Sequence, residues 1–143
     1  MSLPLDDLYR EIILDHYKQP RNRGELDPHT ARVEGNNPLC GDEIQLDVVV
    51  GDGELQDVAF QGRGCSISQA SASMMTEAVK GKPLEEAEEL IETFKSMMHG
   101  EDVDVEALGD LEALEGVQKF PVRIKCALLA WTTLQEALKE AKA

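Results

Sequence analysis

Three cysteines offer most of the reactive chemistry in this sequence. Cys40, Cys65 and Cys126 are an odd number of thiols, so they cannot all pair within one chain. Nothing in the sequence indicates secretion, and free thiols are typical of a reducing cytoplasm. A thiolate is the form of cysteine that binds a metal ion or attacks sulfur. We therefore expect a cytoplasmic protein whose thiols act as ligands, as nucleophiles or as small core residues.

Asp42 adds a carboxylate to this set. It lies two residues after Cys40, and in an extended chain residues i and i+2 point to the same side. Together with Cys65 and Cys126 these residues supply three sulfurs and one oxygen, which suits tetrahedral zinc. The same thiolates can hold iron in an iron–sulfur cluster. The gaps of 25 and 61 residues contain no Cys-X-X-Cys motif, so spacing alone leaves three unrelated free thiols as the alternative.

Two of the cysteines are predicted to lie near helix N-termini. Cys65 follows Gly64 at the start of one helix, and Cys126 lies in the first two turns of the last helix. Unpaired N–H groups and the helix dipole stabilise a thiolate at such a position, more weakly beyond the first turn. Glycines beside Cys65 would also let the backbone approach an ion closely.

Hydrophobic periodicity indicates the helices that position these residues. Apolar residues recur at helical spacing, with Trp131 and the methionine pairs 74–75 and 97–98 expected in the core. The predicted helices span 5–17, 67–78, 84–98 and 121–138, and the acidic segment 99–119 holds at most a short helical piece.

Alternating apolar residues indicate the strands. They predict an antiparallel pair over 44–50 and 55–60, joined by a turn at 51–53, whereas 21–43 is rich in turn-forming residues. Strands that precede most of the helices favour an α+β fold, in which a small antiparallel sheet of about three strands packs against several helices. We expect residues 1–143 to form a single domain.

Charge excludes two classes of partner. The net charge of −14 comes from 28 acidic and 14 basic residues, which argues against nucleic acid and against an anionic membrane. No apolar run reaches the length of a membrane span, and the acidic, amphipathic N-terminus is neither a signal nor a transit peptide. His16, His29 and His99 lie away from the cysteine motifs and are expected to be surface or packing residues.

The cysteine motifs resemble those of a known family. The matching segments are Asp15-His16-Tyr17, Pro20-Arg21-Asn22, Asn37-Pro38-Leu39-Cys40-Gly41-Asp42, the segment 62–68 around Cys65, and Pro121-Val122-Arg123-Ile124-Lys125-Cys126-Ala127. Over nearly the whole chain, the sequence is similar to the IscU/SufU family of iron–sulfur cluster assembly proteins, which is related to the N-terminal part of NifU. Two departures from the scaffold branch favour the SufU-like branch. Lys125 stands where scaffolds have a histidine, and the gap between the second and third cysteines is longer.

This resemblance implies a zinc ion held by Cys40, Asp42, Cys65 and Cys126, with Cys40 as the sulfur acceptor. It implies a sulfurtransferase that takes persulfide sulfur from a PLP-dependent cysteine desulfurase and passes it to a downstream cluster assembly complex or to apo-proteins. The alternative is a scaffold that assembles a [2Fe–2S] cluster, or holds iron, on the same cysteines. A structural zinc module that only binds a partner is the third hypothesis. Lys125 either favours a thiolate at Cys126 or is simply solvated.

Overall fold

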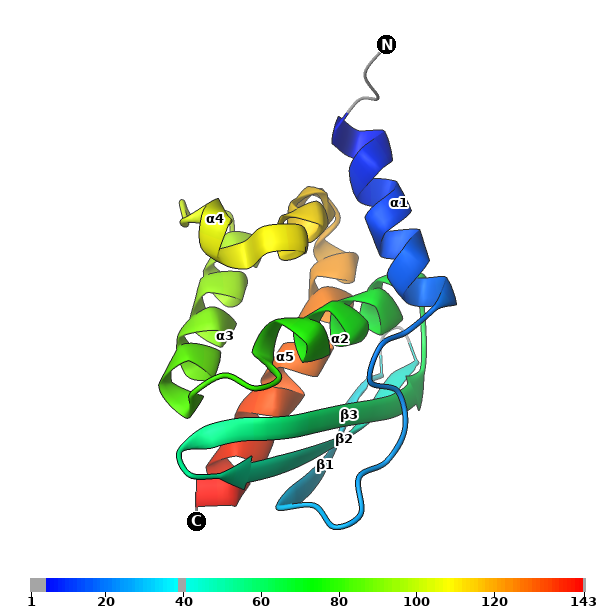
Figure 1. Cartoon of the computed structure of the whole chain (residues 1–143). Coiled ribbons are helices and arrows are strands. Elements are labelled where there is room, and N and C mark those ends of the chain that lie inside the picture. Colours follow the sequence, from blue (N-terminus) through cyan, green and yellow to red (C-terminus); the bar gives the residue numbers. More distant parts are fainter. Residues whose placement is uncertain (1–4, 39–40, 143) are drawn as a thin grey trace.

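A computed structural model describes residues 5–38 and 41–142 of the chain. It contains a three-stranded sheet covered by helices (Figure 1). In chain order the elements are α1 (Leu5–Lys18), β1 (Ala31–Asn37), β2 (Asp42–Gly51), β3 (Glu54–Arg63), α2 (Ser66–Val79), α3 (Leu84–Met98), α4 (Val105–Leu108), the 3₁₀ helix η1 (Gly109–Lys119) and α5 (Pro121–Lys142). The α+β prediction is confirmed.

The sheet is antiparallel, with the strand order β1-β2-β3. Leu46 in the central strand lies opposite Val33 of β1 and opposite Phe60 of β3. Asp52 and Gly53 both have positive φ, of 55° and 75°, as a tight turn between twisted antiparallel strands requires. The predicted strand pair and its turn are therefore confirmed.

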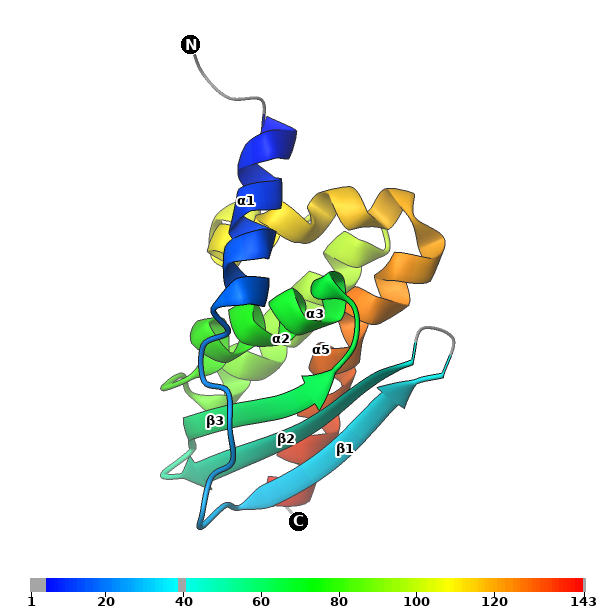
Figure 2. The ribbon, with the colours of Figure 1, turned by 90° about the vertical axis from the view of Figure 1, so that its right-hand side faces the viewer.

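β1 is a strand that the sequence pattern does not reveal. It lies within the stretch 21–43, which the sequence marked only as rich in turn-forming residues, and it supplies the third strand of the expected sheet. Figure 2 shows β1 at the edge of the sheet, where only one of its long sides pairs with another strand. An edge strand tolerates polar residues because half of its surface faces water, so Arg32, Glu34 and Asn36 are exposed on it.

The core lies between the sheet and the helices α2, α3 and α5. Trp131 of α5 is fully buried and stacks on Phe94 of α3, with ring centroids 4.3 Å apart. Its indole N–H donates to Ser71 Oγ at 3.0 Å, and Ser71 in turn donates to the carbonyl of Ala127 at 2.6 Å. These bonds satisfy the polar groups that α2 carries into the core. The predicted core positions of Trp131 and of the methionine pairs 74–75 and 97–98 are confirmed.

α1 packs on α2 through a polar contact as well as an apolar one. His16 is 4% exposed, and its Nδ1 lies 2.8 Å from Ser73 Oγ. Leu8 and Tyr17, two apolar or aromatic residues of this helix, are substantially exposed. Within the described residues, no helix combines the length and the hydrophobicity needed to cross a membrane.

Candidate metal centre

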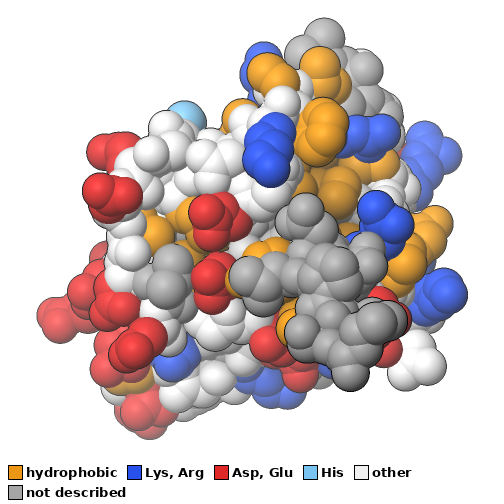
Figure 3. Space-filling view, turned by 90° about the horizontal axis from the view of Figure 1, so that it is seen from above, with side chains coloured by type: hydrophobic (Ala, Val, Ile, Leu, Met, Phe, Trp, Pro, Cys, Tyr) orange, Lys and Arg blue, Asp and Glu red, His pale blue; other side chains and the backbone are white. Residues whose placement is uncertain are grey.

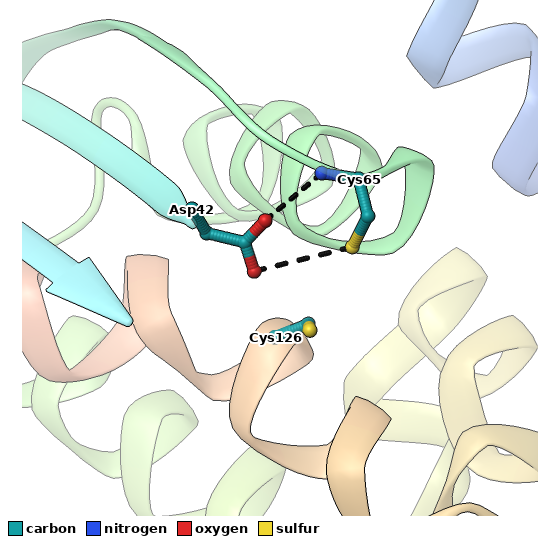
Figure 4. A group of neighbouring side chains, drawn as sticks. All are labelled: Asp42, Cys65 and Cys126. Atoms are coloured by element: carbon teal, nitrogen blue, oxygen red, sulfur yellow. Dashed lines mark hydrogen bonds between the residues drawn. The ribbon is translucent and has the colours of Figure 1, made fainter. Parts of the chain in front are cut away.

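Three potential metal ligands from three different elements meet at one end of the sheet. Asp42 begins β2, Cys65 precedes α2 and Cys126 lies in the second turn of α5 (Figure 4). Their ligand atoms all lie within 4.8 Å of one another. Asp42 and Cys126 are completely buried, and Cys65 is partly buried. Two soft thiols and a carboxylate, close together and shielded from water, form a donor set that fits zinc and also fits iron.

Cys65 is fixed by its position as the N-cap of α2. Its sulfur accepts a hydrogen bond from the backbone N–H of Ser68 at 3.5 Å, and Ser68 Oγ donates to the Cys65 carbonyl at 3.0 Å. Asp42 Oδ1 accepts from the Cys65 backbone N–H at 2.9 Å, and the thiol approaches Oδ2 at 4.0 Å. Asp42 is therefore tied to the start of α2 even before any metal is considered.

Gly64 allows this close approach. A Cβ at position 64 would lie 2.3 Å from Asp42 Oδ1 and 2.7 Å from Ser68 Oγ. Real Cβ atoms do not come so near to other heavy atoms, so a larger residue would displace the carboxylate. Gly64, directly before Cys65, thus reflects the space that Asp42 needs.

Cys126 is held within α5 and contacts β1. Its thiol donates to the carbonyl of Val122, one turn earlier, at 3.7 Å. The side-chain amide of Asn37, at the end of β1, donates to Cys126 Sγ at 4.0 Å. The sulfur therefore lies between the first turns of α5 and the end of the edge strand.

Arg123 is a member of the site that the sequence reasoning did not select. The interaction of its guanidinium with the sulfur of Cys65, and to a smaller extent with that of Cys126, raises the pKa of Arg123 above its ordinary value. The signal was available, because residues three apart on a helix share a face and Arg123 lies three residues before Cys126. Lys125, the cation considered from the sequence, is exposed.

The structure brings together three of the four residues proposed from the sequence. Cys40 lies outside the described residues. In the part of the chain that the structure describes, the candidate metal group contains no histidine. His16 is a packing residue, as expected, and His29 is an exposed loop residue whose Nδ1 lies 3.0 Å from the Leu26 carbonyl. His99 forms the C-cap of α3.

An apolar cavity of about 550 Å³ adjoins the candidate metal centre. It lies between α1, α2, η1 and the start of α5, and Ser66, Ile67 and Arg123 line it beside the two cysteines. Phe120, also in its lining, is 61% exposed, and nearby Val122 is 58% exposed. Figure 3 shows hydrophobic and cationic side chains gathered on one side of this face, with acidic side chains on the other.

Known proteins are similar to this chain in sequence and in fold. Residues 8–127 match the model of the NifU-like N-terminal domain. The zinc-dependent sulfurtransferase SufU of Bacillus subtilis is 51% identical over 135 residues, covering 94% of this chain and 91% of that protein. The iron–sulfur cluster assembly scaffold protein IscU of Streptococcus pyogenes is 48% identical, covering 94% of this chain and 85% of the relative. A crystal structure from Fervidobacterium islandicum, assigned as a cluster assembly scaffold of the SUF system, has a TM-score of 0.86 at 38% identity, covering 90% of this chain and 94% of that one.

Proposed function

The chain belongs to the family of NifU-like N-terminal domains, and from this membership we propose that it is an iron–sulfur cluster assembly protein acting as a zinc-dependent sulfurtransferase. The observation that carries the proposal is the convergence of Asp42, Cys65 and Cys126 within 4.8 Å at the end of the sheet. A relative that shares half of its residues with this chain carries that activity in its name.

Asp42, Cys65 and Cys126 would hold the zinc ion, with Cys40 as the fourth ligand. Zinc has no redox chemistry of its own and keeps bound cysteines as thiolates, which protects them from oxidation while leaving them nucleophilic. The chain's own groups support this arrangement. The N–H of Ser68 and the guanidinium of Arg123 both favour negative charge on the Cys65 sulfur.

Cys40 would accept the sulfur. Its thiolate attacks the terminal sulfur of a persulfide on the donor enzyme, and the electron pair of the broken S–S bond leaves with the donor's thiolate. One S–S bond forms and one breaks, so no external oxidant or reductant is needed. Cys40 is preferred over the other two cysteines because Cys65 caps a helix and Cys126 is buried within one.

A PLP-dependent cysteine desulfurase in the cytoplasm would supply the sulfur, and a downstream cluster assembly complex or apo-protein would receive it. The apolar cavity beside Ser66 and Arg123 supports docking of a protein at this face, because exposed apolar patches next to a reactive site mark interaction surfaces. Phe120 and Val122 supply exposed side chains for such a contact.

Metal analysis and sulfur transfer test the proposal together. We expect the protein purified under reducing conditions to hold about one zinc per chain, because four ligands complete the coordination of one zinc ion. With a cysteine desulfurase and cysteine labelled with sulfur-35, we expect label on the wild-type chain and none on Cys40→Ala. The variant Asn36→Ala, an exposed neighbour in the sequence, is the matched control. Wild-type labelling of Cys40→Ala would refute the assignment of the acceptor.

A [2Fe–2S] scaffold is the second candidate, because a relative with 48% identity is named as one and because thiolates also bind iron. Anaerobic reconstitution with iron and sulfide, followed by visible absorption, distinguishes the two functions. A cluster that is stable and passes intact to an apo-ferredoxin would establish the scaffold. An unstable cluster beside efficient sulfur transfer would establish the sulfurtransferase.

A further inference from the structure

Asn37 is a buried amide at the edge of the candidate metal centre. It is the last residue of β1 and is 7% exposed, whereas the preceding Asn36 faces solvent. Its side-chain Nδ2 donates toward Cys126 Sγ, 89 residues away in the sequence, at 4.0 Å. Burying an amide costs free energy unless the amide is hydrogen-bonded. The Cys126 sulfur is a hydrogen-bond partner for the buried Asn37 amide.

The Arg123 guanidinium interacts with both sulfurs of the described site, and each sulfur has one further donor of its own. Cys65 accepts from the backbone N–H of Ser68, which any residue at position 68 other than proline would supply. Cys126 receives a side-chain donor that only the residue at position 37 provides from β1. Position 37 therefore differs from Arg123 in that its side chain contacts the Cys126 sulfur and not the Cys65 sulfur.

A hydrogen bond to a thiolate withdraws electron density from it. The sulfur remains a metal ligand, but it becomes a weaker nucleophile and is held in one orientation. Cys126 is also completely buried in α5, so both its burial and its hydrogen bond favour a role as a metal ligand and not as a nucleophile.

We propose that Asn37 is a positioning residue that holds the Cys126 sulfur as a permanent metal ligand and keeps it from competing as a sulfur nucleophile. The inference rests on the proposed function, which assigns metal binding and sulfur transfer to these cysteines. It adds that the division of roles among the cysteines is set in part by an amide from the edge strand.

Cobalt(II) in place of zinc provides a spectroscopic test that needs neither a desulfurase nor sulfur transfer. Loss of the amide donor makes the Cys126 thiolate more electron-rich, so the thiolate-to-cobalt charge-transfer band of Asn37→Ala should move to longer wavelength. Asn36→Ala is the matched control and should keep the wild-type band. Identical bands for wild type and Asn37→Ala would overturn the proposal.

Two further variants separate the hydrogen bond from the shape of the side chain, and they apply even if Asn37→Ala binds cobalt poorly. Asn37→Asp has the same shape but lacks the N–H donors, and it should shift the band to longer wavelength. Asn37→Gln keeps the amide donor on a side chain that can still reach the sulfur, and it should stay closer to wild type. The reverse order, or no difference between the two, would contradict the inference.

Alkylation of the cobalt-loaded protein gives a second measurement. Iodoacetamide followed by peptide mass mapping reports the label on Cys126 relative to Cys65. Asn37→Ala should raise that ratio by about two- to tenfold, the range that loss of one hydrogen bond produces. An unchanged ratio in a folded, metal-loaded variant would show that Asn37 only fills space. Because this readout does not depend on sulfur acceptance, it stays informative if the proposed sulfurtransferase function fails.

Discussion

At the level of single residues, the candidate metal centre depends on its ligands and also on the absence of a side chain at Gly64. Gly64→Ala would place a Cβ against Asp42 Oδ1 and displace the carboxylate from the Cys65 N–H. We expect the variant to fold but to retain far less than the wild-type amount of zinc, measured by metal analysis after dialysis. Gly116→Ala, where a Cβ would meet no atom within 4 Å, is the control. Full zinc retention by Gly64→Ala would contradict this description of the site.

Arg123 and Lys125 give a second residue-level prediction. Both side chains are exposed, but the Arg123 guanidinium interacts with the Cys65 sulfur, so the two cations should differ in their effect on the thiols. In zinc-loaded protein, Arg123→Ala should speed the alkylation of Cys65 by iodoacetamide, because the thiolate ligand loses a neighbouring cation that draws electron density from its sulfur. Lys125→Ala should leave the rate close to that of the wild type. A larger effect from Lys125 would reverse the assignment.

The residues of the site differ in how far the sequence could predict them. Asp42, Cys65 and Cys126 were candidates from their chemical types and positions, the family resemblance favoured them as one site, and the structure places all three together. Asn37 could not be found in this way, because its role depends on a contact with a helix 89 residues away. Arg123 was within reach through helical spacing but was not selected.

At the level of elements, the contact between α1 and α2 introduces a pH dependence. Burial, and then the charge of Arg21, lower the pKa of His16 below its ordinary value of 6.5, against the opposing charges of Glu77, Asp15 and Asp110. The folded chain thus binds a proton on His16 less readily than the unfolded chain. The stability this provides is complete above pH 6.5 and is lost as pH falls through the lower, folded-state pKa.

We therefore expect the free energy of unfolding to decrease from pH 7.5 to about 5.5, a window above the range in which carboxylates titrate. Urea unfolding at several pH values measures it. His16→Asn can keep a hydrogen bond to Ser73 without a titratable ring and should flatten this dependence. His29→Asn, at an exposed loop position, should behave like the wild type. An unchanged slope in His16→Asn would refute the role of this histidine.

Elements with one buried face could be predicted from hydrophobic periodicity. Elements that depend on pairing or packing with distant parts of the chain could not. β2 alternates apolar and polar residues because one face packs on helices, so periodicity reveals it. β1 is an edge strand paired with β2, and although its residues alternate in burial, the less exposed positions include Ala31, Val33 and Gly35, of which only Val33 is a strong strand former. η1 buries Leu111, Leu114 and Val117 through a 3₁₀ helix of 11 residues, a length that local sequence rules rarely indicate.

Across the whole molecule, charge is distributed unevenly. Residues 81–118, which hold α3, α4 and η1, carry 12 acidic and 2 basic residues, a balance of −10 out of a total of −14. The residues of the candidate metal centre lie outside this segment, and Arg123 approaches their thiols. Repulsion among the clustered carboxylates should destabilise the folded state at low ionic strength.

We expect the Tm to rise as sodium chloride increases from 10 mM to about 300 mM, because salt screens repulsion over distances of about 10 Å at 0.1 M. Differential scanning calorimetry measures the change. Combining Glu89→Gln, Glu101→Gln and Glu115→Gln, three exposed positions, should raise the Tm at low salt and weaken its salt dependence. A Tm that falls with added salt would show that ion pairs outweigh the repulsion.

The distribution of the ligands along the chain also bears on how the protein is made. Cys126 follows Cys65 by 61 residues, so at about 5–20 residues per second a ribosome needs about 3–12 s to synthesise the chain between them. During that time the nascent polypeptide exposes thiols that cannot yet form the site, because α5 does not exist. Metal loading is therefore a late event of biogenesis, and the emerging chain depends on the reducing power of the cell to keep its cysteines intact until translation ends.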